Sequence, residues 1–160
     1  GGLRNEVGLA FDAFHVLWGV ENGADNLRRD DIGGDIHNTN PGEEVNKFDK
    51  PGAFYGYPYC WSEHSLDAAY ASGTGTQWAW PTFMPPAVPQ VTDSWCRSEQ
   101  NVVAPKIVMQ AHTAPLGIVF YSGFGCNSTA RGFPCEMVGH AFIARHGSWN
   151  AHPPVGYDVV

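Results

Sequence analysis

The chain has 160 residues, a formal net charge of −7 at pH 7, and only 16% charged residues. This acidic balance argues against nucleic acid as a partner, because the phosphate backbone repels an acidic surface. No apolar run approaches the roughly 20 residues that a membrane-spanning helix needs, so we expect no membrane partner. Nineteen glycines, twelve prolines and six tryptophans are typical of a turn-rich β protein rather than a helical one.

Short β patterns recur along the chain and predict an all-β fold. Each is four to seven residues long, contains β-branched or aromatic residues, and is bounded by Gly, Pro, Asn or Asp. A single short helix is expected at Ser65–Ala71. The expected strands are Val7–Phe11, Val16–Glu21, Val45–Phe48, Lys106–Gln110, Gly117–Ser122, His140–His146 and Tyr157–Val160.

Two long insertions interrupt the strands. The first, Leu27–Gly42, is polar and rich in Gly, Asp and Asn, and the second, Ser62–Gln100, contains three tryptophans and a Pro-Pro pair. Loops of this length in a compact domain usually carry function or wrap around a neighbour.

The even spacing of the strands indicates repeated antiparallel sheets, as in a β-propeller. A four-stranded blade takes roughly 40–50 residues and a closed ring needs at least about four blades, so this chain supplies only about three. We therefore expect residues 1–160 to form one partial β-propeller, covering about three central blades, with the remaining blades of the ring as partners. The ends agree with this expectation, because the chain begins at Gly1 without Met and stops within the expected strand Tyr157–Val160.

Four cysteines suggest an oxidising compartment. Cys60 and Cys96 flank the tryptophan-rich insertion, whereas Cys126 and Cys135 bracket a short loop. Neither spacing fits a zinc ribbon, and three disulfide pairings are possible in principle. The loop contains the glycosylation sequon Asn127–Thr129, as expected of an exposed turn. An even cysteine count, a sequon and an acidic composition favour a secreted, extracellular glycoprotein.

Two polar motifs near the N-terminus contain residue types that suit a cofactor site. Arg4 and Asn5 immediately precede the first strand, so their side chains are expected at its end rather than in its body. A guanidinium is a rigid cationic fork that can stabilise negative charge developing on a carbonyl oxygen. The turn Glu21–Asp25 is rich in oxygen atoms, and calcium prefers oxygen ligands, including main-chain carbonyls.

Arg4-Asn5, followed by Gly8–Phe11 and the turn Glu21–Asp25, resembles a motif series of the soluble quinoprotein sugar dehydrogenases. These are six-bladed β-propellers that bind pyrroloquinoline quinone (PQQ) and calcium. The resemblance is closest to the fungal secreted PQQ-dependent pyranose dehydrogenases and their sorbosone dehydrogenase relatives. Further motifs follow in the family's order: Pro41–Lys47, Phe54–Pro58, His112–Gly117 and His146–Asn150.

The resemblance implies roles for the N-terminal motifs. Arg4 and Asn5 would act in catalysis and bind PQQ, because the matching pair lines the cofactor pocket in the family. The backbone carbonyls of Gly23 and Ala24 would bind calcium, with Asp25 as a further direct or water-mediated ligand.

The downstream motifs would complete this part of the site. His112 would lie over the central cavity as a catalytic residue. His146 or Arg145 would replace a lysine that contacts PQQ in the bacterial glucose enzymes, and Trp149 would offer an aromatic wall to a pyranose or to the quinone. The remaining histidines are interpreted as structural.

Some positions depart from the family pattern or lack a match. Val7 stands where the bacterial enzymes have a glutamine near the cofactor, and Ala24 where they have a proline. Glu44 and Asn46 are interpreted as residues that pin the calcium turn. No residue of this chain matches the family's general base.

The function implied by the resemblance is the oxidation of a pyranose sugar by hydride transfer to PQQ. Electrons would then pass to a haem domain of the same polypeptide or to another acceptor. Two alternatives are a calcium-dependent propeller lactonase and a non-catalytic extracellular propeller that binds a protein or a glycan. The lactonases hold their metal with Asn, Asp and Glu side chains, whereas the turn Glu21–Asp25 would use carbonyls beside Arg4.

Overall fold

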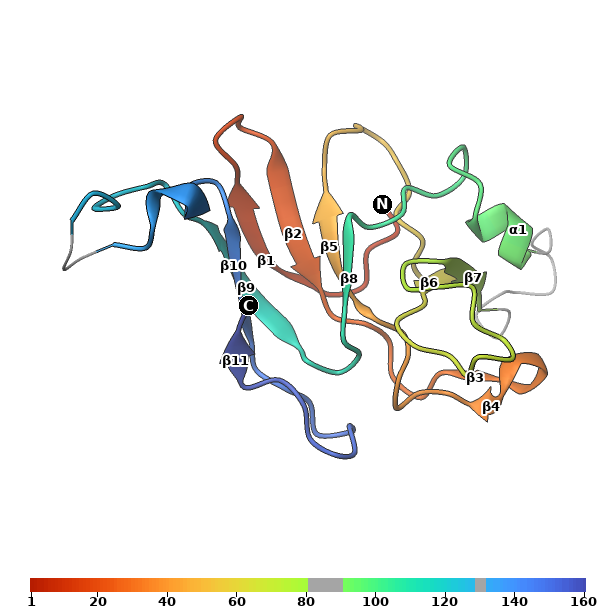
Figure 1. The fold of residues 1–160 in the computed structure, drawn as a ribbon. Coiled ribbons are helices and arrows are strands. Elements are labelled where there is room, and N and C mark those ends of the chain that lie inside the picture. The colour runs from red at the N-terminus through yellow and green to blue at the C-terminus, as the bar shows by residue number, and fades with distance from the viewer. Residues whose placement is uncertain (81–90, 129–131) are drawn as a thin grey trace.

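The computed structural model describes residues 1–80, 91–128 and 132–160, and these residues form an all-β fold of antiparallel sheets (Figure 1). A four-stranded sheet lies at the centre, with strand order β1-β2-β5-β8. Its strands are β1 (Glu6–Phe11), β2 (Leu17–Glu21), β5 (Glu43–Lys47) and β8 (Ile107–Met109). The alternation seen in the sequence predicted all four of these strands to within two residues at each end.

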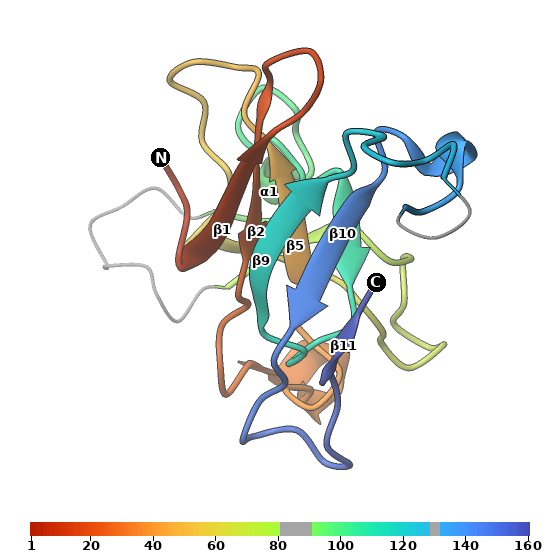
Figure 2. The ribbon, with the colours of Figure 1, turned by 90° about the vertical axis from the view of Figure 1, so that its left-hand side faces the viewer.

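A second sheet packs against the first (Figure 2). It has the strand order β11-β10-β9, with β9 (Pro115–Phe120), β10 (Ala141–Arg145) and β11 (Asp158–Val159). The core between the two sheets consists of buried side chains from both: Val20, Val45, Met109, Ile118 and Ile143. Such face-to-face packing of consecutive antiparallel sheets agrees with the predicted all-β class.

The two insertions fold together on the other side of the central sheet (Figure 1). Together with Cys60 and Trp61, the described residues of the insertions form short strands and helices: β3 (Arg28–Arg29), η1 (Asp30–Ile32), β4 (Gly34–Asp35), β6 (Cys60–Ser62), β7 (Gln77–Ala79) and α1 (Asp93–Cys96). Leu27 and Ile32 of the first insertion pack against Trp61, Trp78 and Trp80. The rings of Trp61 and Trp78 stack with centroids 6.1 Å apart.

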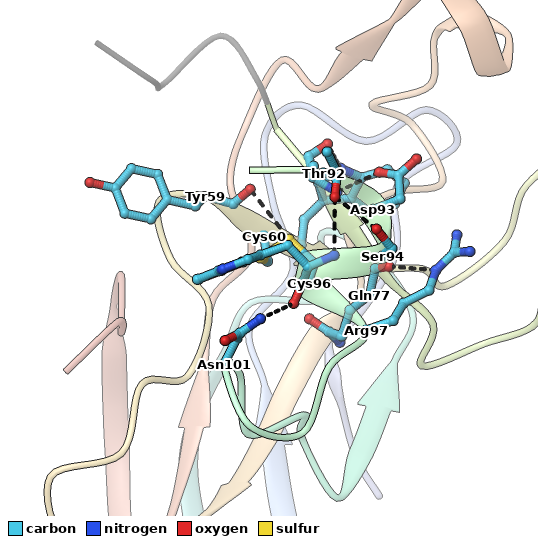
Figure 3. The surroundings of a disulfide bond; sticks show 12 residues. Tyr59, Cys60, Gln77, Thr92, Asp93, Ser94, Cys96, Arg97 and Asn101 are labelled. Atoms are coloured by element: carbon cyan, nitrogen blue, oxygen red, sulfur yellow. Dashed lines mark hydrogen bonds between the residues drawn. A yellow bond between two sulfur atoms is a disulfide. The ribbon is translucent and has the colours of Figure 1, made fainter. Parts of the chain in front are cut away.

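A disulfide between Cys60 and Cys96 joins β6 to α1, and the residues around it are connected by hydrogen bonds (Figure 3). Thr92 caps α1, because its side-chain oxygen accepts a hydrogen bond from the Trp95 backbone N–H. Arg97 Nε donates to the Gln77 carbonyl at 3.1 Å and thereby joins α1 to β7. The second disulfide is Cys126–Cys135, next to the short helix η3 (Cys135–Met137).

The prediction of a helix at Ser65–Ala71 is wrong, because the structure has no helix there. The Asp67 carbonyl accepts hydrogen bonds from Tyr70 and Ala71, and the Asp67 carboxylate accepts one from Ala69, so the segment closes into a turn. An aspartate side chain that binds the backbone two residues on competes with helix formation. No helix among the described residues is long and apolar enough to cross a membrane.

Candidate functional site

The N-terminal segment and the turn after β2 meet at one end of the central sheet. The Arg4 backbone N–H donates to Glu21 Oε1. Arg4 Nη1 donates to the Gly23 carbonyl at 2.8 Å, and Nη2 pairs with Asp25 Oδ2 at 3.2 Å. The structure therefore joins the two motifs that are 17 to 21 residues apart in sequence.

A second wall of the site is the loop between β8 and β9. His112 and Ala114 have positive φ angles of 60° and 47°, which are uncommon for residues other than glycine. His112 is 5% exposed, and its Nε2 lies within hydrogen-bonding distance of the His37 carbonyl. Because a carbonyl only accepts, Nε2 carries the proton in this contact and Nδ1 of a neutral His112 ring remains an acceptor.

The third wall follows β10. The backbone N–H of His146 donates to the Ala114 carbonyl at 2.9 Å, which ties this wall to the second one. Asn150 Nδ2 donates to Asp25 Oδ1 at 2.6 Å, which ties it to the first. Trp149 is 87% exposed and can therefore offer a ring face to a ligand.

The three walls line a pocket of about 410 Å³ that is open to solvent. Six of the residues predicted from the sequence line it: Arg4, Gly23, Asp25, His112, His146 and Trp149. Ala24 instead lines a smaller adjoining cavity, which shares Arg4 and Gly23 with the larger one. The structure thus brings most of the predicted residues together at one place.

Asn5 and Arg145 line neither of these two cavities. The Asn5 carbonyl accepts a hydrogen bond from the Asn22 N–H, so its backbone supports the turn. The Arg145 guanidinium forms a bidentate ion pair with Asp158 on the neighbouring strand β11, with Nε to Oδ1 at 2.7 Å. Of the two alternatives, the placement therefore favours His146 over Arg145 as the residue that meets a ligand.

Glu43 is a pocket residue that the sequence analysis missed. It is 3% exposed, and its carboxylate accepts hydrogen bonds from the N–H groups of Gly23 at 2.5 Å and Ala114 at 3.1 Å. Burial raises the pKa of Glu43 to about 7, although both N–H bonds oppose this shift. The alternation of β5 contained the signal, because Glu43 shares a face with the core residue Val45.

The interpretation of Glu44 as the residue that pins the turn is wrong, because Glu43 makes that contact. The Glu44 side chain leaves the opposite face of β5, where Oε1 accepts a hydrogen bond from Ser62 Oγ at 2.6 Å. Asn46 acts on the turn indirectly, because its Nδ2 donates to Glu21 Oε2 at 3.1 Å.

Glu6, Glu21 and Glu44 lie around the Asn46 amide and form a crowded carboxyl cluster. Burial is the largest cause of their raised pKa values, which are about 7 for Glu6 and about 8 for Glu21 and Glu44. The neighbouring charges of the cluster add to these shifts.

The donor set of the pocket suits an anionic quinone beside a cation. Arg4 supplies a guanidinium, which suits carboxylate and carbonyl oxygens, and His112 and His146 add imidazole rings to the lining. The Gly23 carbonyl borders the pocket and accepts one hydrogen bond from Arg4, so its second lone pair can serve a calcium ion. The described residues contain no cluster of three or more His, Cys, Asp and Glu side chains that could hold a metal.

Comparison with known proteins places this arrangement in a family. The TrAA12-like family model matches residues 1–160, which is the whole chain. The chain belongs to the TrAA12-like family. A PQQ-dependent sugar dehydrogenase of Hypocrea jecorina is 38% identical over 157 residues, which cover 92% of this chain and 31% of that protein. A PQQ-dependent pyranose dehydrogenase of Coprinopsis cinerea is 34% identical over 166 residues, which cover 99% of this chain and 20% of that protein.

Solved structures of TrAA12-like relatives have the same fold over this region. A Trichoderma reesei enzyme of carbohydrate-active family AA12, solved with iodide, has a TM-score of 0.75 and 35% identity. The holo form of the pyranose dehydrogenase PQQ domain from Coprinopsis cinerea has a TM-score of 0.75 and 32% identity. Each comparison covers 99% of this chain, and 37% and 36% of the respective relative. The chain therefore spans about a third or less of the relatives that it matches.

Proposed function

We propose that this chain is part of a PQQ- and calcium-dependent oxidoreductase that oxidises pyranose sugars. The observation that carries the proposal is the pocket in which Arg4, Gly23, His112 and His146 meet. Membership of the TrAA12-like family supports the same reaction class, because the named relatives are PQQ-dependent dehydrogenases. These relatives also favour a dehydrogenase over the two alternatives, a lactonase and a non-catalytic binding module.

The architecture that we propose is a segment of a β-propeller, with residues 1–160 forming about three of its blades. The face-to-face packing of consecutive antiparallel sheets supports this proposal. Both disulfides favour an extracellular location, because such bonds persist in oxidising compartments. The remaining blades would supply the general base and the rest of the sugar site.

Each residue of the pocket has a chemical role in the proposal. When bound, PQQ supplies a carbonyl carbon that accepts hydride from the sugar. Arg4 would bind a carbonyl or carboxylate oxygen of the cofactor and stabilise the negative charge that develops there. The carbonyls of Gly23 and Ala24, with Asp25 nearby, would hold calcium, which would supply a Lewis acid to the site.

The opposite walls would orient the two ligands. His112 would accept a hydrogen bond at Nδ1 from a hydroxyl group of the sugar. His146 would meet the cofactor through Nε2, because its Nδ1 lies 3.1 Å from the Gly147 carbonyl. Trp149 would stack against the pyranose or the quinone plane. Asn5 would support the turn after β2 through its backbone carbonyl. Arg145 would support the wall that follows β10 through its ion pair with Asp158 on β11. Electrons would leave for an acceptor such as a haem domain.

A PQQ titration of the complete protein that contains this chain tests the proposal. With calcium present, we expect saturable PQQ binding, and adding an aldopyranose should bleach the quinone absorbance. A chelator should abolish both signals. An Arg4→Lys variant should lower kcat at least tenfold, because an ammonium lacks the planar fork. An intact protein that binds no PQQ under these conditions would favour the lactonase or the binding module.

A further inference from the structure

We propose that Glu43 is a positioning residue that ties two walls of the pocket together and thereby sets its affinity for cofactor and cation. This inference deepens the proposed function and rests on it. Glu43 would touch neither PQQ nor calcium in this role. It would act through the Gly23 turn on one side and the His112 loop on the other.

The geometry that carries the inference is a bridge made by one carboxylate. Glu43 Oε2 accepts from the Gly23 N–H at 2.5 Å, and Oε1 accepts from the Ala114 N–H at 3.1 Å. These partners lie 20 residues before and 71 residues after Glu43 in the sequence. Gly23 offers its carbonyl to Arg4 on the pocket side, and Ala114 lies two residues beyond His112. A single side chain thus fixes the distance between the Arg4 wall and the His112 wall.

The loop at Ala114 needs this support more than an ordinary loop does. Both His112 and Ala114 adopt left-handed backbone conformations, which persist only where the surroundings hold them. Ala114 is held from both sides, because Glu43 accepts from its N–H and the His146 N–H donates to its carbonyl. Without Glu43, the Ala114 N–H would lose its partner and the strained loop would be free to relax.

Only a carboxylate can make this bridge. Both of its oxygens accept hydrogen bonds, and charged acceptors make the stronger ones. A glutamine keeps the shape but replaces one oxygen with an NH₂ group, which would face one of the two N–H donors. One wall of the pocket would then be released while the side chain stays in place.

The chain contains a matched control for Glu43. Glu63 is also buried, at 1% exposure, and its carboxylate also accepts two backbone N–H bonds, from Ser72 at 3.2 Å and Gly73 at 3.1 Å. It accepts a third hydrogen bond from Trp78 Nε1 at 2.9 Å. It lies in the second insertion and lines neither cavity of the site. Replacing Glu63 with glutamine therefore removes the same kind of interaction without touching the pocket.

The experiment compares Glu43→Gln with Glu63→Gln in the complete protein. We expect Glu43→Gln to raise the Kd for PQQ, and the Kd for calcium in the apoprotein, by ten- to a hundredfold, the loss of one charge-assisted hydrogen bond. Glu63→Gln should lower the unfolding midpoint but change both Kd values by less than about twofold. Hydrogen exchange of the apoprotein should become faster at residues 21–25 and 110–116 together in Glu43→Gln, and at neither in Glu63→Gln. If Glu43→Gln does not fold, Glu43→Asp provides the same comparison, because its shorter side chain cannot reach both donors.

The outcomes separate the inference from the proposed function. If the unmodified protein binds no PQQ, the proposed function fails, and the exchange data still decide whether Glu43 ties the walls. If the protein binds PQQ and Glu43→Gln binds it equally well, the inference is overturned. Equal losses of affinity in the two variants would also overturn it, because they would reflect general destabilisation.

Discussion

The pocket region and the insertion region bury polar groups in different ways. The pocket region comprises β1, β2 and β5 with the loops that follow β2, β8 and β10, and the insertion region comprises β3, β4, β6, β7 and α1. In the insertion region, the half-buried Arg29 is bonded to Asp31, Asp93 and the Ala79 carbonyl, and Glu63 accepts three N–H bonds. Opposite charges there lie next to each other.

The pocket region instead gathers like charges. Four carboxyl groups have pKa values raised to about 7 or 8, mainly by burial: Glu6, Glu21, Glu43 and Glu44. Glu6 Oε1 and Asn46 Oδ1 are buried without a hydrogen-bond partner in the part of the chain that the structure describes. Four non-glycine residues in the loops of this region have positive φ angles: Asn26, His112, Ala114 and Tyr157. This molecule therefore secures its fold in the insertion region and keeps unfavourable electrostatics where a ligand would bind.

The largest expected effect is the loss of the disulfide in the insertion region. Cys60 and Cys96 are 36 residues apart, and Cys126 and Cys135 are 9 apart. Loop-closure entropy assigns about 4 kcal/mol to the first bond and about 3 kcal/mol to the second. Replacing each pair with alanine should therefore lower the free energy of unfolding more for Cys60–Cys96, as measured by urea denaturation. A larger loss for Cys126–Cys135 would contradict the assignment of stability to the insertion region.

The Arg29 network comes next. The hydrogen bonds to Asp31, which have the largest effect, and those to Asp93 raise the pKa of Arg29. The guanidinium is therefore charged in the folded protein. Replacing Arg29 with methionine should cost about 2–3 kcal/mol of unfolding free energy, because two carboxylates lose a largely buried partner. The neighbouring Arg28 pairs with Asp30 at the surface, and Arg28→Met should cost less than about 0.5 kcal/mol. Equal costs would show that burial does not distinguish the two arginines.

The pH dependence of stability tests the pocket region. Because the folded pKa values of Glu6 and Glu44 lie above 4.5, the folded protein holds more protons than the unfolded chain between about pH 4.5 and 8. Stability should therefore fall as the pH rises through this window. Urea denaturation at pH 5 and pH 8 measures the slope. Glu44→Gln should flatten it, and a stability that rises with pH would contradict the prediction.

The smallest effect is expected at Asn127, which lies on the surface away from both regions. When the protein is expressed in a secreting eukaryotic host, Asn127→Gln should remove the mass of one glycan. The unfolding free energy should change by less than about 0.5 kcal/mol, because the side chain is exposed. An unmodified protein whose mass does not change on enzymatic deglycosylation would contradict the sequon prediction.

The strands of the two main sheets were predictable because they alternate. Side chains of β2 and β9 that point into the core are apolar, so period two appears in the sequence. Strands β3, β4, β6 and β7 have only two or three residues, too few to show a period. Tertiary contacts decide their conformation, and they were missed for that reason. The short helix α1 was missed because four residues with a Thr92 cap carry no periodic signal either.

The candidate site was predictable in part, and for a different reason. Arg4, Gly23 and His112 were identified by resemblance, since no local pattern places residues so far apart in sequence around one pocket. Glu43 and Glu44 are adjacent identical residues, and only the face that each occupies on β5 separates their roles. Because alternate side chains of a strand share a face, Glu43 lies on the same face as Val45. This was sufficient to expect a buried carboxylate at Glu43. Its two partners depend on the folded backbone and could not be inferred.

The stacked indoles of the insertion region have a spectroscopic consequence. Trp61 and Trp78 lie with their ring planes inclined by 17°, and the guanidinium of Arg97 lies 4.3 Å from the Trp78 ring centroid. Two neighbouring indoles in a fixed orientation couple their electronic transitions and produce a paired circular-dichroism signal in the ultraviolet. Such a signal reports on the insertions alone, so their folding can be followed separately from that of the sheets that form the pocket.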